Sequence, residues 1–496
     1  MSEPRYTLLH EECIPIVGVG RVPLLRIFED DSLTALSGTP LQKIALMKFL
    51  LAIAQAAATP ADEDEWLELG PEGMAERCVE YLKIHADCFW LYGPRPFLQM
   101  PACEKADVKA FGAVMPEVAF GNTTLLTHIQ LEPELDDAGK FLLLLVQMSL
   151  CFGGKKPYNK LVLTSGYEKK ASARPGPGIC HMGLLHTFFR GRNLWETLWF
   201  NILTLEDIAS QKQWTAGLGI PPWERMPEGE ACPVAEELKS SLMGRLIPMA
   251  RFCLLTDKGL KFTEGIVHPD YSAGMVDPSA AMDASGSKPK MLWTDPEKRP
   301  WRQLPALLSF LDTGEERGFF CLGLQKSVEK LREREDLDDD AQFGIWSGGI
   351  RVSSNAGEQY LTGRDDVVDS ETLIKASWLG SNWFRAFSAA MGRLEGLASL
   401  LYVAVNGYHS AMKVQDRRIA AEASGLFWQM VEPSEHELMA ACDRKSEGWT
   451  EDTLPALLRR YRAMVLSVYD EFCPHDTARQ FEAWVLNRPF SGRKNG

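Results

Sequence analysis

Two glycines directly before two lysines are the clearest sign of ligand contact in this sequence. Gly153 and Gly154 precede Lys155 and Lys156, and the basic residues continue to an Arg-Pro-Gly-Pro-Gly run at Arg174–Gly178. Because glycine has no side chain, a ligand can approach its backbone N–H group closely, while lysine supplies a mobile positive charge suited to phosphate. The segment is either an exposed surface loop or a loop that contacts a nucleic-acid backbone.

The patterns that usually carry catalysis or bind a metal are missing from the sequence. The nine histidines include no H-E-x-x-H motif, and the eleven cysteines form no C-x-x-C pair. There is no nucleophile elbow, P-loop or dinucleotide fingerprint, and Gly344–Gly349 lacks the Lys-Ser/Thr that phosphate binding needs. We therefore expect no catalytic residue, no metal and no cofactor. A stand-alone cytosolic enzyme with a dispersed site between two domains is kept as the alternative.

The overall charge limits how this chain can bind nucleic acid. Its 496 residues carry a formal net charge of −14, whereas proteins that coat nucleic acid are usually basic, so any contact should be narrow. The composition, 45% hydrophobic and 24% charged, is typical of a soluble globular protein. The apolar runs at residues 44–58 and 141–151 are too short to span a bilayer, and no signal sequence begins the chain. With scattered cysteines, this favours a cytoplasmic protein without a membrane partner.

Hydrophobic periodicity predicts an α+β protein whose C-terminal part is helical. In the first part, helical patterns cover residues 41–57, 74–85, 137–150 and 193–203, and β-like pieces lie at residues 6–9, 14–18, 22–27, 246–255, 260–263 and 350–352. In the last third, four apolar patterns at helical spacing predict an antiparallel four-helix bundle, at residues 383–405, 419–430, 454–472 and 478–484. We expect a large mixed α/β domain over residues 1–372 and the bundle over residues 373–496.

Short motifs along nearly the whole chain resemble those of the CasA family, the large subunit of the type I-E CRISPR surveillance complex Cascade. Each motif is short, and their order, their spacing and the terminal bundle carry the resemblance. The motifs are Ile14-Pro15, Pro96–Gln99, Phe152–Gly154, Phe188–Gly191, Asn201–Thr204, Lys261–Thr263, Gly348–Arg351, Ala420–Glu422 and Phe427-Trp428.

The resemblance implies a non-catalytic subunit of an antiviral, RNA-guided complex. Such a subunit recognises the short motif that flanks the target, the PAM, in double-stranded DNA, mostly from the minor-groove side. It helps to start strand separation and recruits a separate helicase-nuclease, while pairing with the guide RNA reads the target sequence. The implied partners are the 5′ handle of the guide RNA, target DNA, the other Cascade subunits and the helicase-nuclease.

The resemblance also places two DNA-reading elements. The family's glycine loop matches Gly153 and Gly154, with Lys155 and Lys156 adding phosphate contacts. Arg174–Gly178 is a rival placement, because residues 156–172 look inserted. The family's lysine finger, which enters the minor groove, matches Lys261 through its Lys-Phe-Thr context, with Lys258 as the second choice.

A wedge and a guide-handle loop complete the implied site. The wedge falls on a hairpin tip at residues 353–357, with Ser354, Asn355 and Ala356 pressing on a base pair and Arg351 at its base. The family's wedge has a glutamine at its tip, whereas this chain has Asn355 there. His128 and Gln130 would contact the guide handle. A helical adaptor that binds only protein is a third hypothesis, but it leaves the glycine–lysine segment unexplained.

Overall fold

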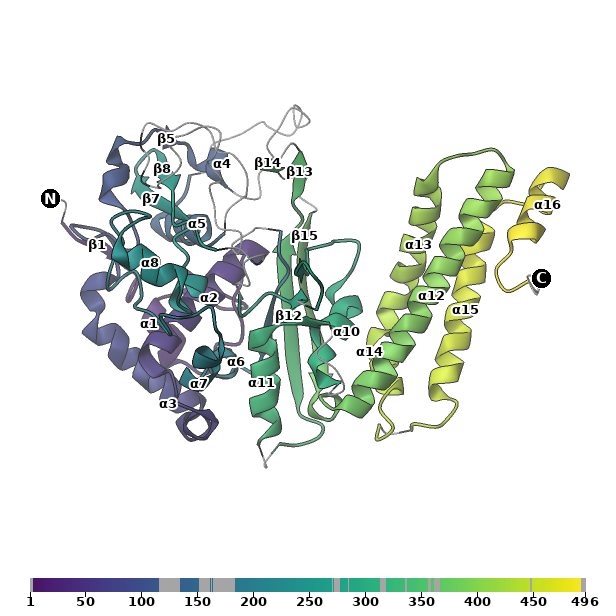
Figure 1. Ribbon diagram of the computed structural model, residues 1–496, viewed down its shortest axis with the longest axis horizontal. Helices are drawn as coiled ribbons and strands as arrows, with labels where there is room; N and C mark the ends of the chain where they lie inside the picture. The colour runs from purple at the N-terminus through teal and green to yellow at the C-terminus, as the bar shows by residue number, and fades with distance from the viewer. Residues whose placement is uncertain are drawn as a thin grey trace. The chain divides into compact units, whose positions relative to one another are not determined.

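The computed structural model describes residues 3–115, 134–150, 161, 163, 183–269, 271, 277–283, 285–312, 318–334, 337–355, 358–360, 366–446 and 448–491. The chain forms two compact units, which are described separately below (Figure 1). The first consists of residues 1–300 and 316–374. The second consists of residues 301–315 and 375–496.

Helix α2 (Pro40–Ala58) is the central element of the first unit. The Thr39 side chain accepts a hydrogen bond from the Gln42 N–H, and the Gln42 side chain binds back to Thr39, so the helix starts at a capping box with proline at its first position. Among the described helices, α2 is the one long and apolar enough to span a membrane, yet 78% of that stretch is buried inside the protein. It is therefore a core helix, and it packs against α3 and α5.

The other helices of the first unit surround α2 or connect the sheets. They are α1 (Leu24–Glu29), α3 (Glu63–Ile84), α4 (Phe111–Val114), α5 (Asp137–Ser149), α6 (Leu194–Asn201), α7 (Leu205–Ser210), α8 (Pro233–Lys239), α9 (Met243–Leu246) and α11 (Leu322–Arg332).

The strands of the first unit form small sheets. Two three-stranded sheets matter for the site. The first has the strand order β15-β12-β6 and consists of β6 (His186–Arg190), β12 (Gln342–Ile350) and β15 (Val367–Lys375). The second has the order β5-β8-β7 and consists of β5 (Val108–Lys109), β7 (Arg251–Thr256) and β8 (Gly259–Glu264). The remaining strands are β1 (Arg5–Thr7) with β4 (Trp90–Tyr92), β2 (Ile14–Ile16) with β3 (Gly20–Val22), β13 (Ser353–Asn355) with β14 (Glu358–Tyr360), and β9 (Met282–Asp283) between β10 (Lys290–Met291) and β11 (Phe319–Phe320).

The second unit is the predicted four-helix bundle. Its long helices are α12 (Ser381–Ala411), α13 (Arg417–Val431) and α15 (Thr453–Phe472), with α16 (Ala478–Asn487) against α12. The short α14 (Glu435–Ala441) and α10 (Leu304–Leu307) complete it. The core contains a ladder of stacked rings, Trp378 on Trp383 and Trp383 on Phe387, with centroids 5.5 and 5.0 Å apart. The expected fold class, a mixed α/β part followed by this bundle, is confirmed.

Three local predictions were wrong. The β-like piece at residues 22–27 is mostly helix α1, because a short apolar run buried on several sides fits a strand and a helix equally well. The helix expected from Met74 begins at Glu63 and continues through a kink at Gly70, whose φ is +62°. The expected hairpin tip at residues 353–357 begins with a strand, since Ser353–Asn355 pairs with Glu358–Tyr360.

Candidate nucleic-acid interface

The β7–β8 hairpin presents Lys258 at its tip. Thr256 pairs with Gly259, so Asp257 and Lys258 form a two-residue turn. The Thr256 hydroxyl donates a hydrogen bond to the Gly259 carbonyl (2.8 Å) and accepts one from the Lys258 N–H (3.3 Å). Gly259 has a φ of +154°, and a Cβ there would lie 2.1 Å from the Lys109 carbonyl oxygen. Only glycine fits this close approach of β8 to β5, so the end of the turn lies directly against β5.

The two lysines matched to the family's lysine finger have different surroundings. Lys258 is exposed and forms no ion pair with any residue that the structure describes. The Lys261 side chain is only 17% exposed, and its Nζ donates hydrogen bonds to the Glu104 carbonyl (2.7 Å) and carboxylate (2.8 Å). Lys261 would have to leave both acceptors before it could reach DNA. Lys258 needs no such change.

Two further lysines lie on or beside the same sheet, and sequence reasoning missed them. Lys109 is on β5, next to Val108, which pairs with Lys261, and Lys105 closes the preceding turn of 3-10 helix. Both side chains are exposed and form no ion pair within the described part of the chain. No sequence motif marks them, since only the pairing of β5 with β8, about 150 positions later, brings them to the hairpin.

The chain near the glycine–lysine segment passes beside this hairpin. The Leu161 carbonyl accepts a hydrogen bond from the Thr263 hydroxyl on β8 (2.7 Å), and the Leu163 carbonyl accepts one from the Glu230 N–H (3.2 Å). The segment itself lies outside the described residues, as do its rival and the guide-handle residues. The predicted contact residues outside the described part of the chain are Gly153, Gly154, Lys155, Lys156, Arg174–Gly178, His128 and Gln130.

The β13–β14 hairpin projects beyond the long strands β12 and β15, at the upper end of the first unit in Figure 1. Ser354 pairs with Gln359, so Ser354 lies within a strand and not at the tip. Asn355 pairs with Glu358 and therefore flanks the two-residue connection that forms the tip. Ala356 belongs to that connection, which lies outside the described residues.

Arg351 anchors the base of this hairpin. Its guanidinium binds the Asp366 carboxylate at 2.6 and 2.9 Å and Glu297 at 3.3 Å, and its N–H donates to the Asp366 carbonyl (2.6 Å). Burial alone would lower the pKa of Arg351, but the hydrogen bonds to Asp366 raise it above its ordinary value. The residue therefore joins the end of β12 to the start of β15, and its charge is already balanced.

The comparison with protein families decides the identity. Residues 7–468 match the family of the CRISPR-associated protein Cse1. The chain belongs to the Cse1 family. A search of curated proteins finds no match.

Solved structures share the fold of this Cse1-family chain. Thermus thermophilus CasA (Cse1) is 17% identical, with 97% of this chain and 98% of that chain covered and a TM-score of 0.70. Thermobifida fusca Cse1 is 18% identical, with 99% and 94% covered and a TM-score of 0.71. A chain of a structure named "CRISPR RNA-guided surveillance complex" is 17% identical, with 98% and 99% covered and a TM-score of 0.72.

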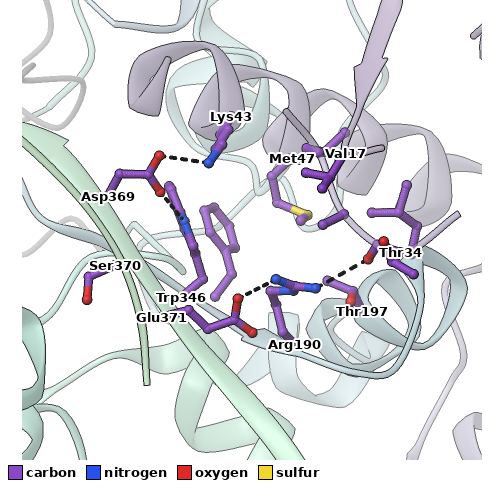
Figure 2. A pocket seen from close by; sticks show the side chains of 14 residues that line it. Val17, Thr34, Lys43, Met47, Arg190, Thr197, Trp346, Asp369, Ser370 and Glu371 are labelled. Carbon is purple, nitrogen blue, oxygen red and sulfur yellow. Dashed lines mark hydrogen bonds and ion pairs between the residues drawn. The ribbon is translucent and has the colours of Figure 1, made fainter. Parts of the chain in front are cut away.

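A pocket of about 530 Å³ lies in the first unit of this Cse1-family chain (Figure 2). Its floor is apolar, and its charged groups bind one another. Lys43 pairs with Asp369 (2.7 Å), whose other oxygen accepts the Trp346 indole N–H (2.8 Å), and Arg190 pairs with Glu371. No histidine or cysteine is among its described lining residues. The pocket could hold a neutral group, and among its described lining residues no hydroxyl is hydrogen-bonded to a basic side chain.

A buried cluster has the residue types of a catalytic site but not the access. His186 Nδ1 lies 2.8 Å from the Ser279 hydroxyl, which donates to Asp277 (2.8 Å), and Asp277 pairs with Lys48 (2.5 Å). All four residues are at most 4% exposed. Burial, and next the charge of Lys48, lower the pKa of His186 to about 3, so it is a poor base. Burial alone would raise the pKa of Asp277, but Lys48 holds it below its usual value. The cluster is a buried polar network of the core.

Proposed function

We propose that this Cse1-family chain is the large, non-catalytic subunit of a type I-E CRISPR Cascade complex in the cytoplasm. In this role it recognises the PAM in double-stranded DNA, helps to start strand separation and recruits the helicase-nuclease. The family match over residues 7–468 carries the proposal. The fold shared with a chain of an RNA-guided surveillance complex supports it.

Residues 1–372 carry the DNA contacts in this proposal, and residues 373–496 form the separate helical domain. On the described surface, the β7–β8 hairpin is the DNA-reading element, with Lys258 as the reaching lysine and Lys105 and Lys109 as phosphate contacts. This choice revises the order suggested by motif matching alone, because Lys261 is bound to Glu104 whereas Lys258 is exposed. The β13–β14 hairpin supplies the wedge, with Asn355 beside its tip.

The partners follow from the same role. Gly153, Gly154, Lys155 and Lys156 add contacts from a segment whose neighbour Leu161 is bonded to β8. His128 and Gln130 contact the 5′ handle of the guide RNA, and other Cascade subunits hold the RNA and most of the DNA phosphates.

Co-expression with the candidate subunits and a guide RNA tests the proposal. The chain should co-purify with the RNA-containing assembly, and the assembly should bind a duplex with the PAM more tightly than the same duplex without it. The Lys258→Ala variant should assemble normally and bind the PAM duplex more weakly. Recovery of the chain as a particle free of nucleic acid, with turnover of its own, would establish the alternative of a stand-alone enzyme.

A further inference from the structure

An apolar groove with an acidic rim runs between α1, α3 and the start of α6. Its cavity volume is about 640 Å³, and all of its lining residues belong to the first unit. Phe28, Val79, Ile84 and Trp195 supply its apolar surface. Ile84, a large aliphatic side chain that lines this groove, is 71% exposed. The groove is therefore an apolar surface that the described part of the chain leaves uncovered.

Contacts of helix α1 hold two of the apolar side chains that line the groove in place. The Trp195 indole N–H donates a hydrogen bond to the Ile27 carbonyl (2.8 Å), so α1 holds the ring in one orientation. Phe28, also on α1, is only 2% exposed, and α1 packs on both α3 and α6. A partner side chain would therefore meet a preformed surface, with little loss of conformational entropy on the protein side.

The rim carries three carboxylates and one ammonium group. Lys83 lies 3.9 Å from Glu29, whereas Glu76 and Glu80 form no ion pair with any residue that the structure describes. Glu76 and Glu80 are one helical turn apart on α3, where like charges repel and slightly destabilise a helix. This excess negative charge beside an apolar floor repels nucleic acid and attracts a basic partner.

We propose that this groove binds a basic, amphipathic helical segment of a protein partner. An apolar side chain of that segment fills the space between Ile84 and Trp195, and its lysine or arginine residues pair with Glu76 and Glu80. The inference does not depend on DNA binding by the β7–β8 hairpin, since it uses a separate surface with the opposite charge. It assigns a protein-docking role to the α1–α3 face.

A labelled peptide tests the proposal on the full chain. The probe is an 18-residue Leu/Lys amphipathic helix with a photo-reactive leucine at the centre of its apolar face, compared with the same peptide carrying Glu in place of Lys. We expect saturable binding of the basic peptide and cross-links to α1, to the second half of α3 or to Trp195. Cross-links confined to other surfaces, or equal binding of the acidic peptide, would overturn the proposal.

Charge reversal on the rim gives the matched comparison. Glu76→Lys with Glu80→Lys should weaken binding of the basic peptide by about tenfold, because each reversal replaces an attraction with a repulsion. Glu68→Lys is the control, since Glu68 is exposed on the same helix but does not line the groove. Ile84→Asp should also weaken binding, and unchanged thermal unfolding will confirm that each variant is folded. The proposal fails if Glu68→Lys weakens binding as much as the double variant, or if Ile84→Asp instead dissociates a dimer of the chain.

Discussion

Replacing Lys258 by alanine should remove one lysine–DNA charge contact, which neutralises phosphate charge from the minor groove, from the assembled complex. For duplex DNA, each such contact contributes a slope of about −0.9 to the dependence of log affinity on log salt. At roughly 0.15 M salt this corresponds to about a fivefold change in affinity, or about 1 kcal/mol. Lys258 is exposed and has no ion pair to break within the described residues, so the whole of this contribution should be lost in Lys258→Ala.

The same estimate gives a different result for Lys261. To contact DNA, its ammonium group would first have to give up the Glu104 carboxylate and carbonyl, both within 2.8 Å. An exposed ion pair is worth up to about 1 kcal/mol, and a hydrogen bond from a charged group adds about 1.5 kcal/mol or more. These costs cancel the gain from one phosphate contact. We therefore expect Lys261→Ala to change the affinity less than twofold, and Glu104→Gln to strengthen binding, because it removes a negative charge beside the hairpin and weakens one of the two interactions that hold Lys261.

Fluorescence anisotropy with a labelled PAM duplex, titrated at several salt concentrations, separates these cases. Lys258→Arg is the matched control, because it keeps the charge and should keep the slope. Lys258→Ala should lower the magnitude of the slope by about 0.9. If Lys261→Ala lowers the slope by that amount while Lys258→Ala leaves it unchanged, the assignment drawn from the Lys261–Glu104 ion pair is wrong.

Three further predictions concern stability. Gly259→Ala should lower the free energy of unfolding in urea by about 3 kcal/mol, since its Cβ would lie 2.1 Å from the Lys109 carbonyl. Burial, and then the charge of Lys48, lower the pKa of His186 to about 3 in the folded protein. The folded state therefore holds His186 neutral, and its contribution to the free energy of unfolding is complete above about pH 6.5 and is lost as the pH falls towards 3. Between roughly pH 6 and 4, the free energy of unfolding should fall by about 1.4 kcal/mol per pH unit because of His186, and His186→Gln should remove this dependence. Arg351→Ala should cost about 1 kcal/mol of stability in urea, because Arg351 is 40% exposed, and leave the salt slope of DNA binding unchanged.

The helical bundle could be predicted from the sequence because its signal is long. Helix α12 alone has 31 residues, and apolar side chains recur along it at helical spacing. Short elements carry too few residues for such a pattern. Helix α1 has six residues, four of them buried, so its sequence looks like a strand. In α3, the Gly70-Pro71 pair reads as a helix break, yet the chain only kinks there and continues.

The turn of the candidate site could be predicted from the sequence, but which of its charged side chains are accessible could not. The Thr256–Gly259 segment has the composition of a tight turn, and it forms one. Which lysine is accessible depends on Glu104, which lies 157 positions from Lys261 in sequence. Arg351 is a similar case, because its partner Asp366 follows an intervening hairpin. Motif matching finds such residues without showing whether a neighbour already balances their charge.

The distribution of charge reconciles an acidic chain with a DNA-reading role. At physiological salt an exposed charge acts over roughly 8 Å, so the net charge of −14 matters less than the charges near each contact. The labels of β7 and β8 and that of helix α3 lie at opposite ends of the first unit in the view of Figure 1. In the proposed role, a duplex would be attracted at Lys258 and repelled at Glu76 and Glu80. On these two proposals each end favours a different class of partner, and the separation would keep DNA on the hairpin side of the unit.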